Sequence, residues 1–319
     1  MNPEDEVLVT IRCMAYNHEP YIRQCLDGFV MQKTNFRFEA IVHDDASTDG
    51  TAAIIREYAA KYPDIIKPIF QTENQYSKHD GAIKRAFDAN TRGKYAAMCE
   101  GDDYWTDALK LQKQVDFMES HPECSLYLSN GYGYYEDTGK TVVLNSVPIS
   151  KSRYLTMSET LREEGGLIPT ASMCMRQEML YSEPEWCLKA PVGDRPLRMW
   201  SAVNGKVYYD VTPMVTYRKN SSGSFTQRVT NREYARHILD RMNEFFDKFD
   251  EFTQYAYHQD VQYMKDREEY SFYSRIADFK SLVKCDFFKS RPLVERLKMQ
   301  AKDSLPGFYS VLKGLKDIF

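Results

Sequence analysis

The chain has 319 residues, of which 43% are apolar and 28% charged, and its formal net charge is −4. This length and apolar content suffice for a large domain with a sizeable core. The acidic balance argues against a protein that binds nucleic acid through overall attraction to phosphates, so we expect no nucleic-acid partner.

The seven cysteines are odd in number, form no CxxC pair, and several lie in apolar runs. This pattern favours reduced thiols in a core over a disulfide framework. The first ten residues lack a basic segment followed by a long apolar run. No apolar stretch approaches the roughly 18 residues that span a bilayer. We therefore predict a cytoplasmic protein without a secretory signal or a membrane span.

The first part of the chain alternates between apolar strands and helices. We predict strands at residues 7–15, 38–43, 67–71 and 94–99, with helices at about 20–32, 51–62 and 80–90 between them. The strands are apolar throughout, which is typical of an α/β fold with a parallel sheet covered on both faces. Ligands of such sheets bind beyond the carboxyl ends of the strands.

The later part of the chain is less regular. We predict an extended strand and turn within 125–137, a short helix near 157–164, a strand within 166–176, and a helix over 194–203 followed by a strand. Residues 231–290 are charged and rich in Tyr and Phe, and we expect them to be helical. These helices could pack on their own or pair two chains, so the oligomeric state stays open.

Polar residues follow three of the predicted strands where each strand ends. They are Tyr16-Asn17-His18, Asp44-Asp45 and Glu100-Gly101-Asp102-Asp103. Neighbouring carboxylates repel one another, so acids at these places indicate a bound cation rather than a contribution to stability. Oxygen ligands suit Mg²⁺ or Mn²⁺, usually shared with phosphate oxygens. We therefore predict a divalent metal that carries a diphosphate. The alternative is a strand end with solvated acids.

Three stretches, AYNHEPYIRQCLDGFVMQ, IVHDDASTDGT and CEGDDYW, resemble in order and spacing the family 2 glycosyltransferases of GT-A fold. The likeness is strong over about residues 7–130 and weaker over about 166–220. It implies an inverting enzyme that transfers a sugar from a nucleotide sugar, most often a UDP-sugar. The acceptor would be a hydroxyl of a glycan or a lipid-linked molecule in the synthesis of bacterial surface polysaccharide.

The resemblance also implies a division of the chain. A GT-A domain, with a Rossmann-like and mostly parallel sheet flanked by helices, would span residues 1–225. Its nucleotide-sugar-binding half would be 1–105 and its acceptor half 106–225, and residues 226–319 would form a helical extension.

For the nucleotide, the resemblance assigns the turn after the first strand, Ala15, Tyr16 and Asn17. An aromatic ring and main-chain groups of this turn would face the base. Asp44 and Asp45 match an acidic pair of which one member accepts a hydrogen bond from the base. The sequence leaves open which of the two does so.

Glu100-Gly101-Asp102 occupies the position of the family's DxD motif, with Glu in place of the first Asp. The resemblance implies that Asp102 binds the metal and that Glu100 faces the sugar or the ribose. Asp103 would contact the donor sugar or the water shell of the metal.

An inverting transfer also needs a carboxylate that takes the proton of the acceptor hydroxyl. In the family this acid opens a helix well after the DxD motif, often as Glu-Asp. Here Asp194 opens the predicted helix, and Gly193 stands in the place of the Glu. Asp194 could also serve as the N-cap of that helix, and the two roles are compatible.

Four further residues receive roles from the resemblance. Thr170 and Ser172 are expected to line the acceptor pocket. Trp105 is expected to cover the core, with stacking on an acceptor sugar as the alternative. Arg218 either clamps the diphosphate or forms a surface salt bridge. Residues 221–224 are expected to become ordered when the donor binds.

The last 39 residues, 281–319, contain eight basic and four acidic residues, a net charge of +4 on a chain that is otherwise −8. Basic and apolar residues in one segment favour peripheral contact with an anionic membrane at its inner face, where a lipid-linked acceptor lies. The alternative is packing on the catalytic domain with the lysines in solvent.

Two other functions stay open. A nucleotide-sugar-binding protein without catalysis remains possible because Gly193 departs from the family pattern. A sugar nucleotidyltransferase is disfavoured, since AYNHEP is not a glycine-rich loop with Arg or Lys that could hold a triphosphate.

Overall fold

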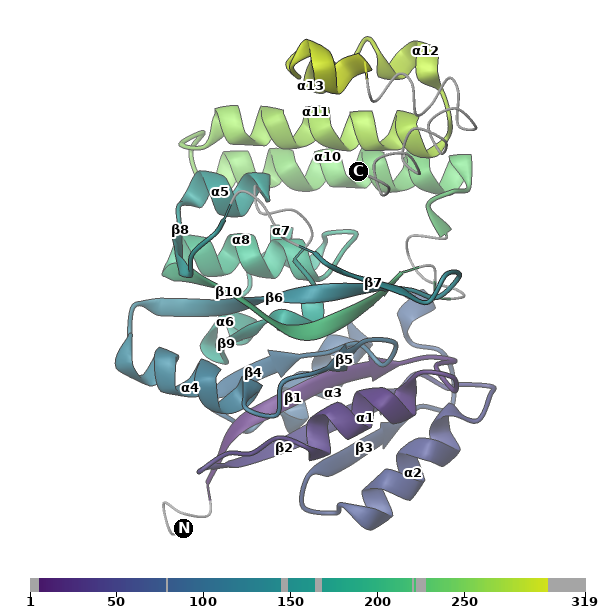
Figure 1. The fold of residues 1–319 in the computed structure, drawn as a ribbon, viewed down its shortest axis with the longest axis vertical. Coiled ribbons are helices and arrows are strands. Elements are labelled where there is room, and N and C mark those ends of the chain that lie inside the picture. Colours follow the sequence, from purple (N-terminus) through teal and green to yellow (C-terminus); the bar gives the residue numbers. More distant parts are fainter. Residues whose placement is uncertain are drawn as a thin grey trace, which may run out of the picture. The chain divides into compact units, whose positions relative to one another are not determined.

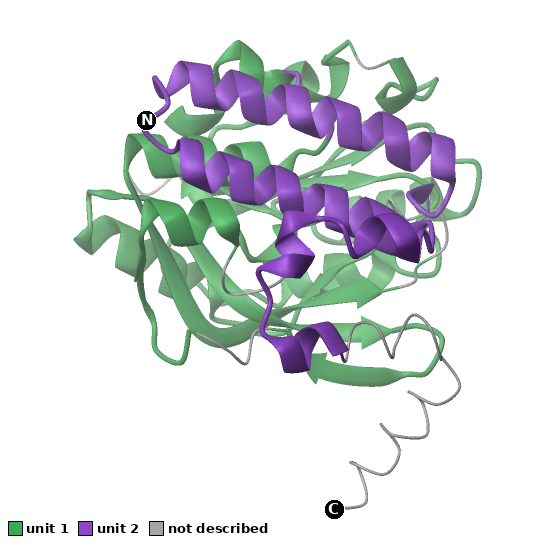
Figure 2. Cartoon of the chain, turned by 90° about the horizontal axis from the view of Figure 1, so that it is seen from above, with its two compact units in different colours: residues 1–188, 192–221 green, residues 189–191, 222–319 purple. Residues whose placement is uncertain are grey.

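The computed structural model describes residues 6–78, 80–144, 149–163, 168–219, 221 and 228–297 (Figure 1). The chain divides into two compact units. The first consists of residues 1–188 and 192–221, and the second of residues 189–191 and 222–319 (Figure 2).

The first unit begins with four strands in parallel order, β3-β2-β1-β4, joined by helices. The strands are β1 (Val7–Ala15), β2 (Arg37–Asp44), β3 (Ile66–Phe70) and β4 (Tyr95–Met98). The connecting helices are α1 (Ile22–Val30), α2 (Thr51–Lys61) and α3 (Ala82–Asn90), with a 3₁₀ turn, η2 (Tyr76–Lys78). In Figure 1, α1 and α2 lie in front of these strands and α3 behind them. The alternation predicted for this part of the chain is confirmed.

The sheet continues through β9, β6, β10 and β5, with β7 paired to β6 and β8 to β10. These strands are β5 (Tyr104–Trp105), β6 (Cys124–Tyr135), β7 (Lys140–Val143), β8 (Arg153–Leu155), β9 (Cys174–Arg176) and β10 (Lys206–Lys219). The other elements are α4 (Lys110–Ser120), α5 (Met157–Arg162), η3 (Thr170–Ser172), α6 (Glu178–Tyr181), α7 (Glu185–Leu188) and α8 (Asp194–Asn204). Strands β6 and β10 are parallel, whereas β9 runs antiparallel to β4 and β6. The α/β fold is thus confirmed, with a parallel first half and a mixed second half.

Two of the differences from expectation have a clear physical reason. Helix α4 was not predicted, because its buried face includes Lys110 and Gln114 beside Leu111, Val115 and Met118 and so lacks a clean apolar stripe. Within residues 166–176 the strand is only three residues long, and η3 precedes it. Such a short strand leaves too few residues for a period to be read.

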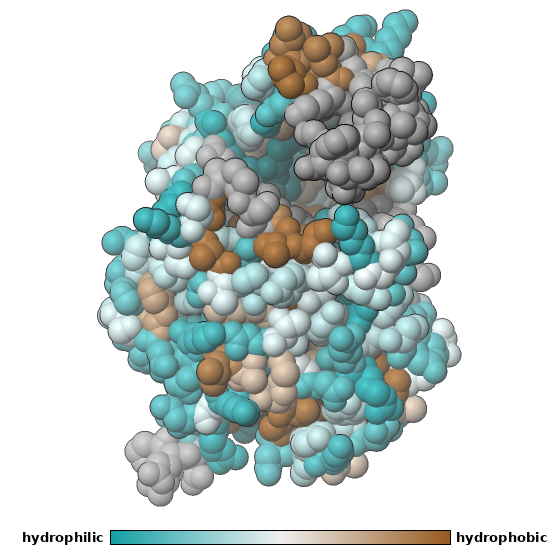
Figure 3. Space-filling view, viewed as in Figure 1, coloured by the Kyte–Doolittle hydropathy of each residue, from teal (hydrophilic) through white to brown (hydrophobic). Residues whose placement is uncertain are grey.

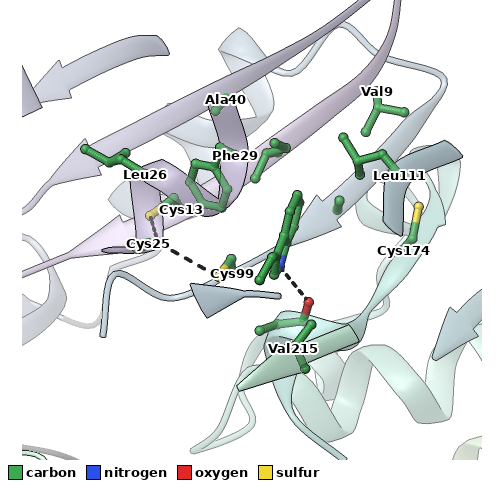
Figure 4. Packing of buried hydrophobic residues seen from close by; sticks show 14 of the residues in the cluster. Val9, Cys13, Cys25, Leu26, Phe29, Ala40, Cys99, Leu111, Cys174 and Val215 are labelled. Carbon is green, nitrogen blue, oxygen red and sulfur yellow. Dashed lines mark hydrogen bonds between the residues drawn. The ribbon is translucent and has the colours of Figure 1, made fainter. Parts of the chain in front are cut away.

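The core of the first unit lies between β1, β4 and the helices α1 and α4 (Figure 4). Trp105 packs edge-on against Phe29, with ring centroids 5.0 Å apart. Beside them the sulfur of Cys25 lies 3.9 Å from those of Cys13 and Cys99. Burial raises the pKa of the Cys99 thiol to about 11. All seven cysteines are buried and free, as predicted.

The second unit is helical, as expected for residues 231–290. Helices α10 (Arg232–Phe252) and α11 (His258–Arg275) are followed by α12 (Phe279–Leu282) and α13 (Asp286–Lys289). The two long helices run side by side (Figure 2). The side chain of Asn231 accepts a hydrogen bond from the N–H of Tyr234 and so caps α10. Along α10 the buried residues recur every three or four positions, which places one face in the core of this unit.

On the face drawn in Figure 3, hydrophobic residues form separate patches among hydrophilic ones. Among the described residues, none of the helices is both long enough and apolar enough to cross a bilayer.

Candidate active site

The three polar clusters meet at one edge of the sheet, where parallel strands end together. Asp44 lies opposite Ala15 in the β1–β2 register, and the N–H of Asp45 donates to the carbonyl of Ala15 at 2.9 Å. On the other side of β1, the N–H of Gly101 donates to the carbonyl of Met14 at 2.9 Å. Backbone pairing therefore holds the turn after β1 between the two acidic segments.

Within that turn, Asn17 and Tyr16 differ in surroundings. Asn17 has a positive φ of 55°, a conformation that Asn tolerates well. Its side-chain oxygen accepts the N–H of Thr48 at 2.8 Å, and its own N–H donates to Ser47 at 2.9 Å. Asn17 thereby ties the turn to the loop after β2. The ring of Tyr16 is exposed and can meet a ligand.

The two acids after β2 are both buried but have different partners. Asp45 accepts the N–H of Gln75 on one carboxylate oxygen and the N–H of Tyr76 on the other, at 2.7 and 2.9 Å. It thus holds the loop that follows β3. Asp44 accepts the N–H of Ser47 on Oδ2 at 3.3 Å, while its Oδ1 has no hydrogen-bond partner among the described residues.

The motif Glu100-Gly101-Asp102 packs against the turn after β1. A Cβ atom added at Gly101 would lie 2.8 Å from Nδ1 of His18 and 3.1 Å from Cβ of Ala15, so a side chain there would separate the two segments. Burial lowers the pKa of His18, although the nearby Asp102 acts in the opposite direction. A neutral imidazole therefore lines the acidic motif.

The carboxylates of this motif carry unbalanced negative charge. The pKa of Glu100 is raised to about 8, first by burial and then by the charges of Asp102 and Asp194. Asp102 is half-buried, and Oγ of Ser221 lies 3.2 Å from its Oδ2. An approaching cation would relieve this repulsion.

Asp103 faces inward. It is 1% exposed, and its Oδ1 accepts the N–H of Arg218 at 2.9 Å. Burial and the charges of Asp102 and Glu100 raise its pKa well above the ordinary range. Its surroundings are those of an internal brace rather than of a group that contacts a donor sugar.

Asp194 lies at the first residue of α8, where sequence reasoning expected it. Its Oδ2 accepts from Nη1 of Arg198 at 2.7 Å, one turn later on the same helix. The charge of Asp194 acts on Glu100, so the start of α8 and the acidic motif lie within electrostatic range. A search for i, i+4 pairs of opposite charge would have found Arg198 from the sequence. No sequence signal indicated that Arg198 also pairs with Glu163.

The Arg218 side chain is buried and already engaged. It pairs with Glu136 and with the side-chain oxygen of Gln24, and it lies over the rings of Tyr21 and Tyr104. The salt bridge expected of it therefore exists, but in a buried setting. To clamp a diphosphate, the guanidinium would have to leave these partners.

The residues expected to bind the acceptor divide into two kinds. Thr170 is half-buried at the start of η3. Ser172 is fully buried, so the expectation that it lines an open pocket is wrong. Trp105 is 2% exposed, and its indole N–H donates to the carbonyl of Ala171 at 3.0 Å. It covers the core, as the favoured interpretation held, which leaves little of the ring open to an acceptor sugar.

Parts of two predictions lie outside the described residues. The segment expected to become ordered on donor binding is described only at Ser221. The basic segment 281–319 is described only up to residue 297.

The site can hold a divalent cation only with help from a ligand. No group of three or more His, Cys, Asp and Glu side chains in the described residues is placed to bind a metal by itself. Glu100 and Asp102 are both half-buried carboxylates of the motif, and Asp103 is turned inward. A hard cation bound by one carboxylate completes its oxygen ligands with phosphate and water, so these residues fit a metal that arrives with a diphosphate.

Comparison with known sequences gives a family match. Residues 11–180, more than half of the chain, match the family described as Glycosyl transferase family 2. An uncharacterised protein of Mycobacterium tuberculosis is 36% identical over 230 residues, which make up 70% of this chain and 62% of that protein. The chain thus spans less than two thirds of the length of this relative.

One relative has a name that states its donor, its acceptor and its linkage. The UDP-Glc:alpha-D-GlcNAc-diphosphoundecaprenol beta-1,3-glucosyltransferase WfaP of Escherichia coli is 30% identical over 141 residues, 44% of this chain and 52% of that enzyme.

Solved structures show the same fold at low sequence identity. TarS of S. aureus (residues 1–349) has a TM-score of 0.54 at 16% identity, covering 93% of this chain and 81% of its own. A mannosyltransferase from Pyrobaculum calidifontis, solved with GDP-Man and Mn²⁺, has a TM-score of 0.57 at 14% identity over 99% of this chain and 88% of its own. At such identities the likeness establishes the GT-A fold and nothing further.

Proposed function

Because the chain belongs to glycosyltransferase family 2, we propose that it transfers a sugar from a nucleoside diphosphate sugar to a hydroxyl group of an acceptor, with inversion at the anomeric carbon. A UDP-sugar is the proposed donor, and Mn²⁺ or Mg²⁺ the proposed metal. The acceptor is a glycan or a lipid-linked glycan in the synthesis of surface polysaccharide.

One observation carries the proposal. Burial first, and then the charges of Asp102 and Asp194, 92 positions apart in sequence, raise the pKa of Glu100 at the carboxyl edge of the sheet. Folding collects negative charge there at a cost in stability, and such strain is typical of sites that bind a cation or move a proton. This favours an enzyme over a binding protein without catalysis, since binding alone would not require Asp194.

The positions expected to bind the nucleotide fall into two groups according to their hydrogen-bond partners. The exposed ring of Tyr16 would face the base, and Oδ1 of Asp44 would accept a hydrogen bond from it. Ala15 contributes its main chain at the start of the turn. Asn17 and Asp45 would act indirectly by holding the loops that form the walls of the pocket.

Asp102 would hold the metal, with Glu100 and Gly101 beside the donor sugar or the ribose. A bound divalent cation supplies positive charge that stabilises the departing diphosphate. His18 stays neutral because of its burial, so it does not bring a positive charge to the place where the metal would bind.

In the transfer step, the acceptor oxygen forms a bond to the anomeric carbon as the bond from that carbon to the diphosphate oxygen breaks. Asp194 takes the proton of the acceptor hydroxyl, and the nucleoside diphosphate leaves with the bonding electron pair. Thr170 would line the acceptor side. We propose that Arg218 braces Asp103 and α1 instead of clamping the diphosphate.

The choice of acceptor has two supports. The Escherichia coli relative is named for a diphosphoundecaprenol-linked acceptor, and the chain ends in a basic segment that favours an anionic membrane surface.

Calorimetric titration with UDP and with GDP, each with Mn²⁺ and with chelator, tests the proposal. We expect one of the two nucleotides to bind, only when metal is present, and Asp102→Ala to abolish that binding. Asp116→Ala, which changes an exposed acid on α4, is the matched control and should bind as the wild type does. Binding that ignores both metal and Asp102 would overturn the proposal.

A further inference from the structure

The carboxylate of Asp194 is held by its own helix. Nη1 of Arg198 donates to Oδ2 of Asp194 at 2.7 Å, and the Arg198 side chain is 4% exposed while that of Asp194 is 30% exposed. A buried cation therefore fixes one oxygen of a carboxylate that stays partly open to solvent. An isolated i, i+4 pair on a helix surface would hold its acid far more loosely.

A second acid shares this cation. Glu163, just after α5, pairs with Arg198 and accepts from Nε of Arg195 at 3.1 Å. The backbone of Glu163 is left-handed, with φ 52° and ψ 48°. A non-glycine residue adopts this conformation at a cost of about 1–2 kcal/mol, and such residues concentrate at functional sites. Glu163 is the C-cap residue of α5, where the left-handed conformation is common, and the two arginines of α8 pair with its side chain.

The charges around Asp194 oppose one another. Arg198 pairs with Asp194, whereas Glu163 draws on the same guanidinium. Arg195 also pairs with Glu163. A base held by a cation alone would be oriented but weak, because its ionised form would be too stable to accept a proton.

We propose that Arg198 and Glu163 are positioning residues for Asp194. Arg198 holds Oδ2 so that Oδ1 is presented to the acceptor hydroxyl, and Glu163 holds the guanidinium of Arg198 in place. The inference rests on the proposed role of Asp194 as the base.

The test compares Arg198→Gln, Arg198→Lys and Glu163→Gln with the wild type. For Arg198→Gln we expect kcat for UDP release from the donor to fall about 10- to 100-fold with little change in donor KM, because the base is misplaced while the donor site is intact. The acidic limb of the pH–rate profile should move up by about one pH unit, because the cation is lost. For Glu163→Gln the limb should move down, and Arg198→Lys should recover part of the loss.

Arg92→Gln is the matched control, since it removes an arginine from the buried Glu39 of β2. It should change stability without moving the pH profile. Unchanged kcat in Arg198→Gln, or limbs that move in the same direction in the Arg198 and Glu163 variants, would overturn the inference.

A second readout needs no substrate. The titration of the Asp194 carboxyl carbon, followed by ¹³C NMR and assigned with Asp194→Asn, should shift in opposite directions in Arg198→Gln and Glu163→Gln. No shift in either variant sinks the inference even if the enzyme is inactive on the donors tried. Failure of the wild type to bind UDP or GDP with Mn²⁺ would instead sink the proposed function, so the two failures are distinguishable.

Discussion

The main-chain N–H of Arg218 donates a hydrogen bond of 2.9 Å to Oδ1 of Asp103, 115 positions earlier in the sequence. This bond attaches the end of β10 to the acidic motif. It also distinguishes two neighbouring acids, because Asp103 is turned into the protein while Asp102 is half-buried at the edge of the sheet. We expect the two positions to respond to mutation in different ways.

Asp103→Ala should be less stable than Asp103→Asn by about 1–3 kcal/mol, because alanine leaves the buried N–H of Arg218 without an acceptor. The asparagine variant keeps an acceptor oxygen and removes the charge, so the comparison isolates the hydrogen bond. Urea unfolding measures both. Asp102→Ala is the control and should stay within about 1 kcal/mol of the wild type. Equal stabilities of the two Asp103 variants would contradict this role.

The pair Asp44 and Asp45 should separate in the same manner. Asp44→Ala is expected to weaken nucleotide binding about tenfold, because it removes the carboxylate oxygen that has no partner in the described residues. Asp45→Ala should instead lower the free energy of unfolding by about 2 kcal/mol, since the N–H groups of Gln75 and Tyr76 lose their acceptors. Calorimetry and urea unfolding on both variants decide the matter. A larger loss of nucleotide affinity in a well-folded Asp45 variant would reverse the assignment.

Trp105→Phe tests whether this ring belongs to the core. The variant keeps an aromatic ring beside Phe29 but removes the hydrogen bond to Ala171, which leaves a buried carbonyl without its donor. We expect a loss of about 1–3 kcal/mol in unfolding free energy and unchanged nucleotide affinity. A stable variant with a raised acceptor KM would show that the ring contacts the acceptor after all.

The position of the site followed from the sequence because it depends only on strand order. Apolar strands in βα alternation place their carboxyl ends together, and the acids after β2 and β4 could be recognised there. Which of two adjacent acids faces a ligand depends on the twist of the last residues and on loops that arrive from far along the chain. Gln75 reaches Asp45 and Arg218 reaches Asp103 in this way, and no local pattern encodes either contact.

Helix α4 shows a second reason why sequence-based prediction fails. Its sequence looks polar because Lys110 and Gln114 lie on the buried face, where they bond to each other. Hydrophobic periodicity cannot register polar side chains that satisfy one another inside the protein. Glu163 was missed in a similar way, because its polar partners lie more than 30 positions away on α8.

The basic segment 281–319 is expected to bind an anionic membrane surface. Near a membrane each lysine contributes about 1 kcal/mol, so replacing Lys298, Lys302, Lys313 and Lys316 by Gln should weaken binding to phosphatidylglycerol vesicles more than tenfold. Cosedimentation measures this, with phosphatidylcholine vesicles as the uncharged reference. The matched control carries Lys33→Gln, Lys61→Gln, Lys94→Gln and Lys113→Gln in the first unit. Equal binding of the two variants would remove the membrane role of the segment.

Lys110 gives a stability that depends on pH. Its side chain is fully buried, with Nζ 4.1 Å from the centroid of the Trp105 ring and 2.8 Å from Oε1 of Gln114. Burial lowers its pKa to about 8 in the folded protein, from 10.5 for an ordinary lysine. Below pH 8 the folded state must carry a buried charge, and the full penalty is present. Between the two pKa values the unfolded chain binds more protons than the folded protein, so stability rises with pH.

The wild type should therefore gain about 2–3 kcal/mol of unfolding free energy relative to Lys110→Met between pH 7 and pH 10.5. Urea unfolding of both proteins at several pH values measures the difference, in which other titrating groups cancel. Lys113→Met, on the exposed side of the same helix, should show a difference from the wild type that is nearly flat with pH. A flat difference for Lys110→Met as well would mean that the amine stays charged in the core, stabilised by the face of Trp105 and by Gln114.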